Sequence, residues 1–574
     1  MLDLQSPLVN KQLFENEVNV SSDSDATSAF DVERHAHLNF YTCFVRDILL
    51  HQRHASVQPA LLAAHHDDID LVMLQALDHI ALTCGDSGVT ARTLSCLADM
   101  LAVMSEGKGG LRSGPAQHPN WSKACQLLEA NRTEEGIKEL AHVRTSWLSS
   151  PLSLNRAARH YEAAAQCFIR KTVAKVADHM CLVPRPKSDS APWHCAYCAC
   201  RIDIAGGWSD TPPITYECGN AAVCNMAVLI DAKRPMGAKC RKVSTFIGLK
   251  IVIKNEGRTD EELTFSQLSD MTCYSNPGAP GALICAIMIA TKLIDLNSER
   301  SIGDQLESKL GNGFRGLEIE SWSNLPPGSG LGTSSILMGC LLAVVYRCAG
   351  IDVDVDSLIH GVLYVEQLLT TGGGWQDQVG GLVPALKIGR FRDTRISVEH
   401  LACSQELEQV LNDRLLLVYT GKTRLAKNLL QEVVRQWFSR QSHVVHTVQA
   451  LVVTAERCAK AVKHHNIDGQ IEECLSTMAD CARDYWQQKI KMAPGSNPVY
   501  VNRLLTLLYD QNIIMVGWLA GAGGGGYLYL LLNKNKTRKD VEDVLRSNDI
   551  KECQDMTVHS VTVANEPLVL YEQD

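Results

Sequence analysis

Long hydrophobic runs are missing from this chain of 574 residues. The longest apolar stretch, Ala282–Ala290, is far shorter than the roughly 18–20 residues that cross a bilayer, and Lys292 soon follows it. The first residues, MLDLQSPLVNKQLFENE, also lack the basic start and apolar stretch of a secretory signal. We therefore expect a cytoplasmic protein with no membrane partner.

The chain also has fewer basic than acidic residues. The 55 Lys and Arg residues are outnumbered by 64 Asp and Glu residues, which gives a net charge of −9 and an isoelectric point near 6.1. This balance argues against a nucleic-acid partner. It leaves ATP open as a ligand, because phosphate binding needs local hydrogen-bond donors rather than a basic surface. The 21 cysteines are scattered, and we expect them to be reduced and structural.

Three familiar ligand-binding patterns are incomplete. Gly421–Thr423 reads Gly-Lys-Thr, but Leu416 stands where a P-loop needs its first glycine. The glycines of Gly521–Gly526 have GxGxxG spacing, yet they lead into an apolar strand rather than a helix, which argues against a dinucleotide site. The run His194–Cys200 contains three cysteines but has no second ligand pair at zinc-finger spacing, so we expect no zinc.

The first third of the chain has a helical pattern. After a start rich in Ser and Asp that is typical of a boundary, apolar residues recur at helical spacing from Phe30 to about Met180. A linker with two prolines near its start, Val183–Trp193, follows. We predict a mainly helical region over residues 1–190.

Beyond the linker, short β-rich runs alternate with helical stretches, which is typical of an α/β or α+β fold. A long helical segment is predicted from Ala426 to about Trp486, and a closing strand over residues 557–572. We place the second and third domains at residues 191–395 and 396–574.

Leu325–Ser335 reads LPPGSGLGTSS and lies between a predicted strand, Gly316–Trp322, and a predicted helix, Thr333–Cys348. Its glycines let backbone N–H groups converge on an anion at the helix N-terminus, and its hydroxyls can cap the helix or reach a metal. An ordinary Gly/Pro turn with a Ser cap is the alternative. The candidate phosphate-binding residues are Pro327, Gly328, Ser329, Gly330, Leu331, Gly332, Thr333, Ser334 and Ser335.

Two carboxylates follow this loop. Glu366 falls on the apolar face of a predicted helix, Ser357–Leu369, where a charge is costly unless it is paired or coordinated. Asp377 follows a helix end in the glycine-lined turn GGGWQDQ, and an acid there suits a catalytic base. Taken singly, Glu366 could be a rim glutamate and Asp377 an N-cap. The loop and both acids in this order predict a magnesium-dependent ATP phosphotransferase.

Two further segments suit a hydroxyl-rich ligand. Arg201–Asp210 reads as a strand that ends in a Gly-Gly turn and presents Ser and Asp at its tip; a plain strand end is the alternative. Gly521–Gly526 leaves room for a ligand against its backbone, and a flexible hairpin is the alternative. We select Trp208, Asp210, Gly523 and Gly524 as candidate substrate-binding residues.

In that order, RIDIAGGWSDTPP, LPPGSGLGTSS, GGGWQDQ and GAGGGG resemble the motifs of the GHMP kinase superfamily. The form AGGWSDTPP, with YTGKTR at Tyr419–Arg424, resembles the kinase domain of the L-fucokinase family over roughly residues 190–574. Residues 1–190 resemble the region before that domain. The resemblance implies an α+β fold in two parts, an α/β N-terminal half and a ferredoxin-like C-terminal half, after a helical region.

The resemblance also implies roles for individual residues. ATP phosphates would lie on the 327–335 loop, with Ser334 and Glu366 coordinating Mg²⁺. Asp377 would act on the attacking hydroxyl, Arg201 would stabilise charge, and Asp210 would hold the sugar. The pattern departs from the family in one place, because many relatives have Lys where this chain has Trp518.

The activity implied is transfer of the ATP γ-phosphoryl group to the anomeric hydroxyl of L-fucose, so that the expected partners are a sugar and ATP. Galactokinase-like relatives have Gly-Glu-His-Thr-Asp where this chain has Gly206–Asp210, and we expect Trp208 to offer an apolar surface to the methyl group of the 6-deoxy sugar. The alternatives are a kinase for another sugar such as a heptose phosphate, a catalytically silent sugar-binding regulator, and a helical interaction module with a degenerate kinase. The larger pyrophosphorylase-like region usual in fucokinases does not occur in this sequence.

Overall fold

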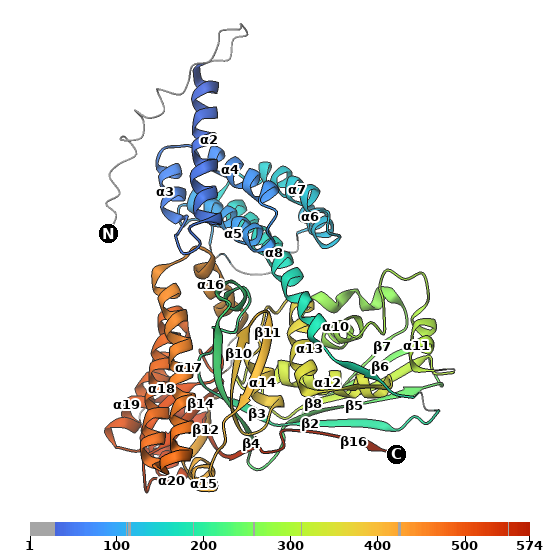
Figure 1. Ribbon diagram of the computed structural model, residues 1–574, viewed down its shortest axis with the longest axis vertical. Helices are drawn as coiled ribbons and strands as arrows, with labels where there is room; N and C mark the ends of the chain where they lie inside the picture. The colour runs from blue at the N-terminus through green and yellow to red at the C-terminus, as the bar shows by residue number, and fades with distance from the viewer. Residues whose placement is uncertain are drawn as a thin grey trace.

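The computed structural model describes residues 29–574, apart from 111, 113–115, 117, 187–188, 256–258, 312, 423–425 and 549. The predicted Ser- and Asp-rich boundary and the residues Thr423–Arg424 of YTGKTR lie outside the described residues. Helices α2 to α8 form the top of the molecule in Figure 1 and confirm the predicted mainly helical region. They are Ala29–Leu50 (α2), Gln58–His66 (α3), Asp70–Thr83 (α4), Ser87–Met104 (α5), Pro119–Glu129 (α6), Thr133–Thr145 (α7) and Pro151–Ala174 (α8).

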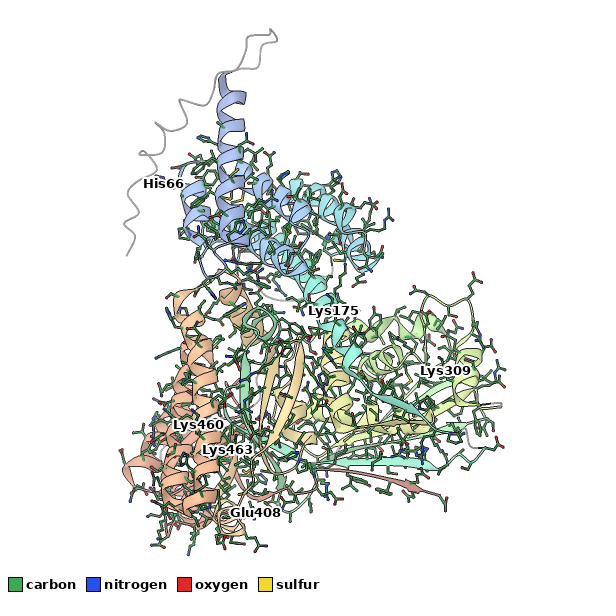
Figure 2. All side chains as sticks on the ribbon, viewed as in Figure 1. His66, Lys175, Lys309, Glu408, Lys460 and Lys463 are labelled. Atoms are coloured by element: carbon green, nitrogen blue, oxygen red, sulfur yellow. The ribbon has the colours of Figure 1, made fainter. Side chains whose placement is uncertain are left out.

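Helix α8 leads from this region into the rest of the chain. It begins where Ser150 accepts a hydrogen bond from the backbone N–H of Ser153 and Pro151 occupies the first turn, a favourable N-terminus. Its apolar side packs along α5. Lys175, labelled in Figure 2, follows its last residue, and α8 there contacts the helix Val355–Leu368 (α13) of the lower part.

One sheet has the strand order β16-β2-β5-β8-β6-β7. Helix α12, Thr333–Cys348, packs on β2 and β5 and is buried on nearly all sides, as its continuous apolar sequence requires. This helix confirms the predicted range, and β8 confirms the predicted strand. The strands are Trp193–Cys198 (β2), Met236–Val243 (β5), Gly248–Asn255 (β6), Glu261–Phe265 (β7), Gly316–Ser323 (β8) and Leu568–Gln573 (β16).

A second sheet runs β11-β10-β4-β15-β12-β14-β13, with β3 paired to β4. Helices α17, Ser442–Asp468, and α18, Ile471–Met492, pack against it at β3, β4 and β13, and with α16, Ala426–Phe438, they confirm the predicted helical segment. The strands are Cys200–Ala205 (β3), Ala221–Ile230 (β4), Leu386–Arg392 (β10), Arg395–His400 (β11), Leu415–Tyr419 (β12), Ile514–Leu519 (β13), Tyr527–Leu532 (β14) and Thr557–Val563 (β15).

The remaining described elements connect these layers. A short pair of strands, Leu182–Pro184 (β1) and Ile351–Val353 (β9), links the end of the helical region to the residues before α13. None of the helices formed by the described residues is long and apolar enough to cross a membrane. The other α-helices are Ile214–Cys218 (α9), Ala282–Ala290 (α10), Ile302–Leu310 (α11), Gln376–Leu382 (α14), Gln405–Arg414 (α15), Val499–Asp510 (α19) and Arg538–Ser547 (α20).

The closing strand predicted over residues 557–572 is wrong in one respect, because it is two strands. β15 pairs with β4 and β12 in the second sheet, whereas β16 crosses to the first sheet and pairs with β2. Residues 564–567 between them contain a proline, which cannot donate to a ladder. The two predicted kinase halves therefore share strands, and the proposed boundary at 395/396 falls beside the turn of the β10–β11 hairpin.

Candidate active site

The glycine-rich segment after β8 forms a tight loop at the start of α12. Gly328, Gly330 and Gly332 have φ angles of 72°, 80° and 76°, and Gly332 directly precedes the helix. Backbone N–H groups at such a helix N-terminus suit a phosphate. The hydroxyls of Ser329 and Thr333 hydrogen-bond at 2.9 Å and brace the loop. The exposed members of the predicted phosphate-binding set include Pro327, Gly328 and Ser334; the buried ones include Ser329, Leu331 and Ser335.

This loop closes against the glycine-rich hairpin between β13 and β14. The Tyr527 N–H donates to the carbonyl of Ser329 at 2.9 Å, and a Cβ on Gly330 would lie only 2.8 Å from the carbonyl oxygen of Ala520. Gly523 and Gly524, predicted to contact substrate, are half-buried at the hairpin tip. The structure therefore brings these two predicted segments into direct backbone contact.

Arg201 lies in β3, in which every residue is buried. Its Nη1 donates to Oδ1 of Asp203 at 2.6 Å, while Nε and Nη2 donate to Oδ1 of Asp377 at 2.8 and 2.6 Å. Burial opposes the charge on Arg201, but the two carboxylates outweigh burial and hold its pKa well above the ordinary value. The guanidinium is thus a permanent cation shared by two acids.

Asp377 is partly exposed, with 26% of its side chain accessible, whereas its partner Arg201 is buried. It lies in the first turn of α14 rather than in the glycine-lined turn that was predicted to follow a helix end, which corrects the local structure predicted for it. A Cβ on Gly332 would lie 3.0 Å from Cβ and Cγ of Asp377, so the last glycine of the loop touches it. Arg201, Asp377 and the candidate phosphate loop therefore meet at one place.

Glu366, on α13, is 3% exposed. Its Oε1 accepts from the Ser335 hydroxyl at 2.6 Å and its Oε2 from the Thr371 hydroxyl, whereas Ser334 is exposed. The coordination of Mg²⁺ by Ser334 and Glu366 stays a prediction, and in this structure the hydroxyl that contacts Glu366 is that of Ser335, the next residue of α12. Burial raises the pKa of Glu366, and the two hydroxyls only partly oppose it.

A magnesium ion fits this carboxylate. Among the described residues, no ion pair includes Glu366, and its partners are hydroxyl oxygens, the hard ligands that Mg²⁺ prefers. The described part of the chain contains no cluster of three His, Cys, Asp or Glu side chains that could cage a metal. An ion at Glu366 would therefore complete its shell with phosphate oxygens and water, as Mg²⁺ commonly does.

The tip after β3 holds Trp208 and Asp210. Asp210 is 1% exposed; Oδ1 accepts from the Trp208 N–H and Oδ2 from the Gln376 N–H, both at 3.0 Å. Burial raises the pKa of Asp210 to about 7, and the nearby Asp377 carboxylate adds to the rise. Trp208 has a φ of 80° and is 7% exposed, a strained backbone for a bulky residue and a conformation that clusters at functional sites.

Gly374 explains how the tip joins the rest of the site. A Cβ on this residue would lie 2.0 Å from Oδ2 of Asp210, so only glycine lets the two segments meet. Gln376 follows two residues later and Asp377 after it. The structure thus brings together Arg201, Asp210, Asp377, Glu366 and the loop.

Several buried groups of the site were missed by the sequence reasoning. Asp203 has no exposed surface and accepts from the hydroxyls of Tyr485 and Tyr529 at 2.7 and 3.0 Å, and Lys489 lies 3.6 Å from it. Asp203 could have been found, because it lies two residues from Arg201 on the same face of a buried strand. Trp518, the departure from the family pattern, donates from Nε1 to the carbonyl of Asp203 at 2.8 Å.

Residues 299–383 match the family described as GHMP kinases N terminal domain. This part of the chain is similar to the N-terminal domain of the GHMP kinases. The match covers the candidate phosphate loop, Glu366 and Asp377, the three elements whose order first indicated a phosphotransferase.

Two curated proteins are similar to this chain over about half of its length. The bifunctional fucokinase/GDP-fucose pyrophosphorylase of Arabidopsis thaliana is 30% identical over 329 residues, which are 56% of this chain and 28% of that protein. The L-fucokinase/L-fucose-1-P guanylyltransferase of Bacteroides fragilis is 32% identical over 335 residues, which are 56% of this chain and 33% of that protein. The matched part is about a third or less of either relative.

Solved structures align at low identity. A D-glycero-D-manno-heptose 1-phosphate kinase from Bacteriodes thetaiotaomicron aligns with a TM-score of 0.44 and 15% identity over 66% of this chain and 98% of its own. A Lactococcus lactis galactokinase complexed with galactose aligns with a TM-score of 0.43 and 12% identity over 66% of this chain and 95% of its own.

Proposed function

We propose that this chain transfers the γ-phosphoryl group of ATP to a sugar, and that the sugar is L-fucose, phosphorylated at its anomeric hydroxyl. The observation that carries the proposal is the contact of Asp377 with both Arg201 and the last glycine of the loop. A base that touches a phosphate cradle can face the attacking hydroxyl and the γ-phosphate at once. The names of the two curated relatives support the choice of L-fucose.

In this proposal the protein contributes mainly position and charge, because the transition state of phosphoryl transfer is loose. The backbone N–H groups of the loop and the α12 N-terminus hold the phosphates. Glu366, with a hydroxyl from the start of α12, would hold the magnesium that neutralises phosphate charge. Asp377 takes or orients the proton of the sugar hydroxyl, and Arg201 holds the Asp377 carboxylate in position through two hydrogen bonds.

Asp210 and Trp208 are proposed to hold the sugar. The Asp210 carboxylate accepts a hydrogen bond from the N–H of Gln376, the residue before Asp377. This contact would set the distance between the sugar site and the base. Trp208 would present an apolar surface to the 6-methyl group. One methyl in an apolar site is worth only about 1–3 kcal/mol, so the preference over L-galactose, which has a hydroxymethyl there, should be roughly 10–200-fold in kcat/KM.

The test is phosphate transfer from ATP to a panel of sugars, including L-fucose, L-galactose and a heptose phosphate, with the product identified by its phosphorylated position. We expect L-fucose 1-phosphate. Asp377→Asn should lower kcat by roughly 10²–10⁴-fold while ATP still binds, because a positioned base contributes that much. A good rate on another sugar with none on L-fucose would overturn the substrate, and no transfer to any sugar would overturn the activity.

Trp208→Ala gives a second, independent check on the sugar. It should lower the ratio of kcat/KM for L-fucose to that for L-galactose more than it lowers ATP affinity. Both sugars are measured with both proteins. An unchanged ratio would remove Trp208 from sugar selection while leaving the phosphotransfer assignment intact.

A further inference from the structure

Lys489 is a fully buried cation that the proposed mechanism does not use. It lies on α18, and its side chain has no exposed surface. Its ammonium donates to the carbonyl of Leu519 at 2.8 Å and lies 3.6 Å from Oδ2 of Asp203, with the rings of Tyr485 and Trp486 at 4.7 and 5.6 Å. A buried ammonium is costly unless a charge compensates it, and Asp203 is that charge.

The charges around Asp203 balance only when Lys489 is counted. Two cations, Arg201 and Lys489, face two carboxylates, Asp203 and Asp377. The other titratable groups that touch Asp203 are the hydroxyls of Tyr485 and Tyr529, whose pKa values burial raises well above the ordinary value, so they stay neutral donors. Without Lys489 the cluster would carry one uncompensated negative charge.

The loss of the positive charge of Lys489 would change the position of the Arg201 guanidinium. Asp203 and Asp377 compete for one guanidinium, and Asp203 is the buried competitor, held by Nη1 at 2.6 Å. While Lys489 neutralises Asp203, Nε and Nη2 of Arg201 remain directed at Asp377. Once Asp203 has only Arg201 as a cation, attraction in a poorly solvated interior would draw the guanidinium inward.

We propose that Lys489 is a positioning residue of the phosphotransfer site, which neutralises Asp203 so that Arg201 stays directed at Asp377. The proposal rests on the proposed function for its kinetic test. It assigns α18, a helix outside the segment that matches the GHMP kinases N terminal domain, a direct electrostatic link to the catalytic aspartate.

The first test is a double-mutant cycle of Lys489→Met and Asp203→Asn. Lys489→Met should lower kcat by roughly 10²-fold, the scale of a misplaced catalytic group, with the KM for ATP within threefold of wild type. The double variant removes one charge of each sign, leaves the Arg201–Asp377 pair, and should recover at least tenfold in kcat over Lys489→Met. Lys491→Met, at an exposed lysine on the same helix, is the matched control and should match wild type.

Melting temperatures test the coupling between Lys489 and Asp203 without requiring catalytic activity. The effects of Lys489→Met and Asp203→Asn on melting temperature should not be additive: the double variant removes both charges of the pair and should melt higher than the sum of the two single effects predicts. If Lys489→Met is insoluble, a folded double variant supports the proposal. Additive effects on both kcat and melting, or a double variant that also fails to fold, would overturn it.

The pH dependence of kcat distinguishes a positioning role of Lys489 from a purely structural one. Burial lowers the pKa of Lys489 to about 8 against the raising effect of Asp203, so kcat should fall as the pH rises above about 8. Since the unfolded lysine keeps its proton to about pH 10.5, this titration removes a burial penalty and does not unfold the protein. Lys489→Arg, which stays charged, should move the alkaline limb upward; an unmoved limb would count against the proposal.

Failure of the proposed function would look different. If the wild-type chain phosphorylates no sugar, the activity is wrong, and the melting series still decides whether Lys489 balances Asp203. If wild type is active and Lys489→Met matches it, only the role of Lys489 is overturned.

Discussion

Glu366 is the residue whose surroundings are hardest to explain without a cation. It is buried, its pKa is raised by that burial, and its described partners are hydroxyl groups. A carboxylate in such a place is stabilised when a metal ion takes up its charge. The contact with Ser335 rather than Ser334 leaves the exposed Ser334 hydroxyl available beside the phosphate loop.

Glu366→Gln should therefore raise the Mg²⁺ concentration needed for half-maximal turnover by about tenfold or more, because glutamine keeps the shape and loses the charge that attracts the ion. Ser334→Ala should raise it by less. The measurement is a magnesium titration at saturating ATP and sugar. Glu473→Gln, at an exposed glutamate of α18, is the control, and identical titrations for Glu366→Gln and wild type would contradict the assignment.

Asp210 carries a pH dependence of its own. Its pKa, raised by burial to about 7, means that the carboxylate forms as the pH rises from 6 to 8. A carboxylate accepts hydrogen bonds from sugar hydroxyls more strongly than an acid does, so the sugar KM should fall several-fold over this range. Stability should move the other way: the contribution of the buried proton is fully present below the ordinary Asp pKa of 3.8, is lost as the pH rises to about 7, and changes little above that value.

The measurement is the KM for sugar between pH 6 and 8 and the melting temperature between pH 4 and 8. Asp210→Asn, which cannot ionise, should flatten both profiles between these limits. A wild-type KM that does not change with pH would remove ionised Asp210 from sugar binding.

At the scale of elements, α8 connects the helical region to the active site. Nε2 of Gln166 donates to Oε1 of Gln367 at 3.1 Å, and Nε2 of Gln367 donates to the carbonyl of Gly373 at 3.1 Å. Gln367 has no exposed surface and follows Glu366 on α13, while Gly373 belongs to the segment that touches Glu366. Two hydrogen bonds thus join α8 to the residue after the candidate metal ligand and to the segment before α14, the helix that carries Asp377.

Gln166→Ala should lower kcat by about three- to tenfold with little change in melting temperature, since one hydrogen bond is worth roughly 1 kcal/mol and Gln166 lies at the edge of the contact. Steady-state kinetics and a melting curve check this. Arg156→Ala, at an exposed position of the same helix, serves as the control. An unaltered kcat would show that α8 supports the fold without acting on the site.

Sequence patterns predicted the helices and strands better than they predicted which side chains contact one another. The bounds of α12 were predictable because an unbroken apolar run follows three glycines, and Glu366 because a carboxylate stands out on an apolar helical face. Lys489 gave the same signal, since it lies four residues after Tyr485 and three after Trp486 on the buried face of α18. What no local pattern could supply is that α18 packs on β3, some 280 residues earlier, so the meeting of Lys489 and Asp203 depends on the tertiary fold.

At the scale of the whole molecule, the described core is continuous. One hydrophobic cluster extends from Tyr41 in the helical region through both sheets to Val563. The pairing of β16 with β2 adds a backbone tie, with Leu568 opposite Cys198 and Gln573 opposite Trp193. The sequence pattern separates the helical region from the two predicted kinase halves, whereas in space these parts share a core.

Deleting residues 568–574 should destabilise the protein by about 3–6 kcal/mol, because β2 loses a ladder of hydrogen bonds worth roughly 0.5–1.5 kcal/mol each and becomes an open edge. Urea unfolding and light scattering check the loss of stability and the expected association. Removing Asp574 alone, which lies outside β16, is the control. Equal stability of both truncated chains and wild type would show that β16 does not hold the first sheet together.

The pairing of β16 with β2 also means that β2 is synthesised long before the strand that pairs with it. About 370 residues separate Cys198 from its partner Leu568. At roughly 5–20 residues per second, a ribosome needs about 20–75 s to make them. Throughout that interval the backbone N–H and C=O groups on the outer side of β2 have no β16 to pair with, and they are open to pairing with another chain.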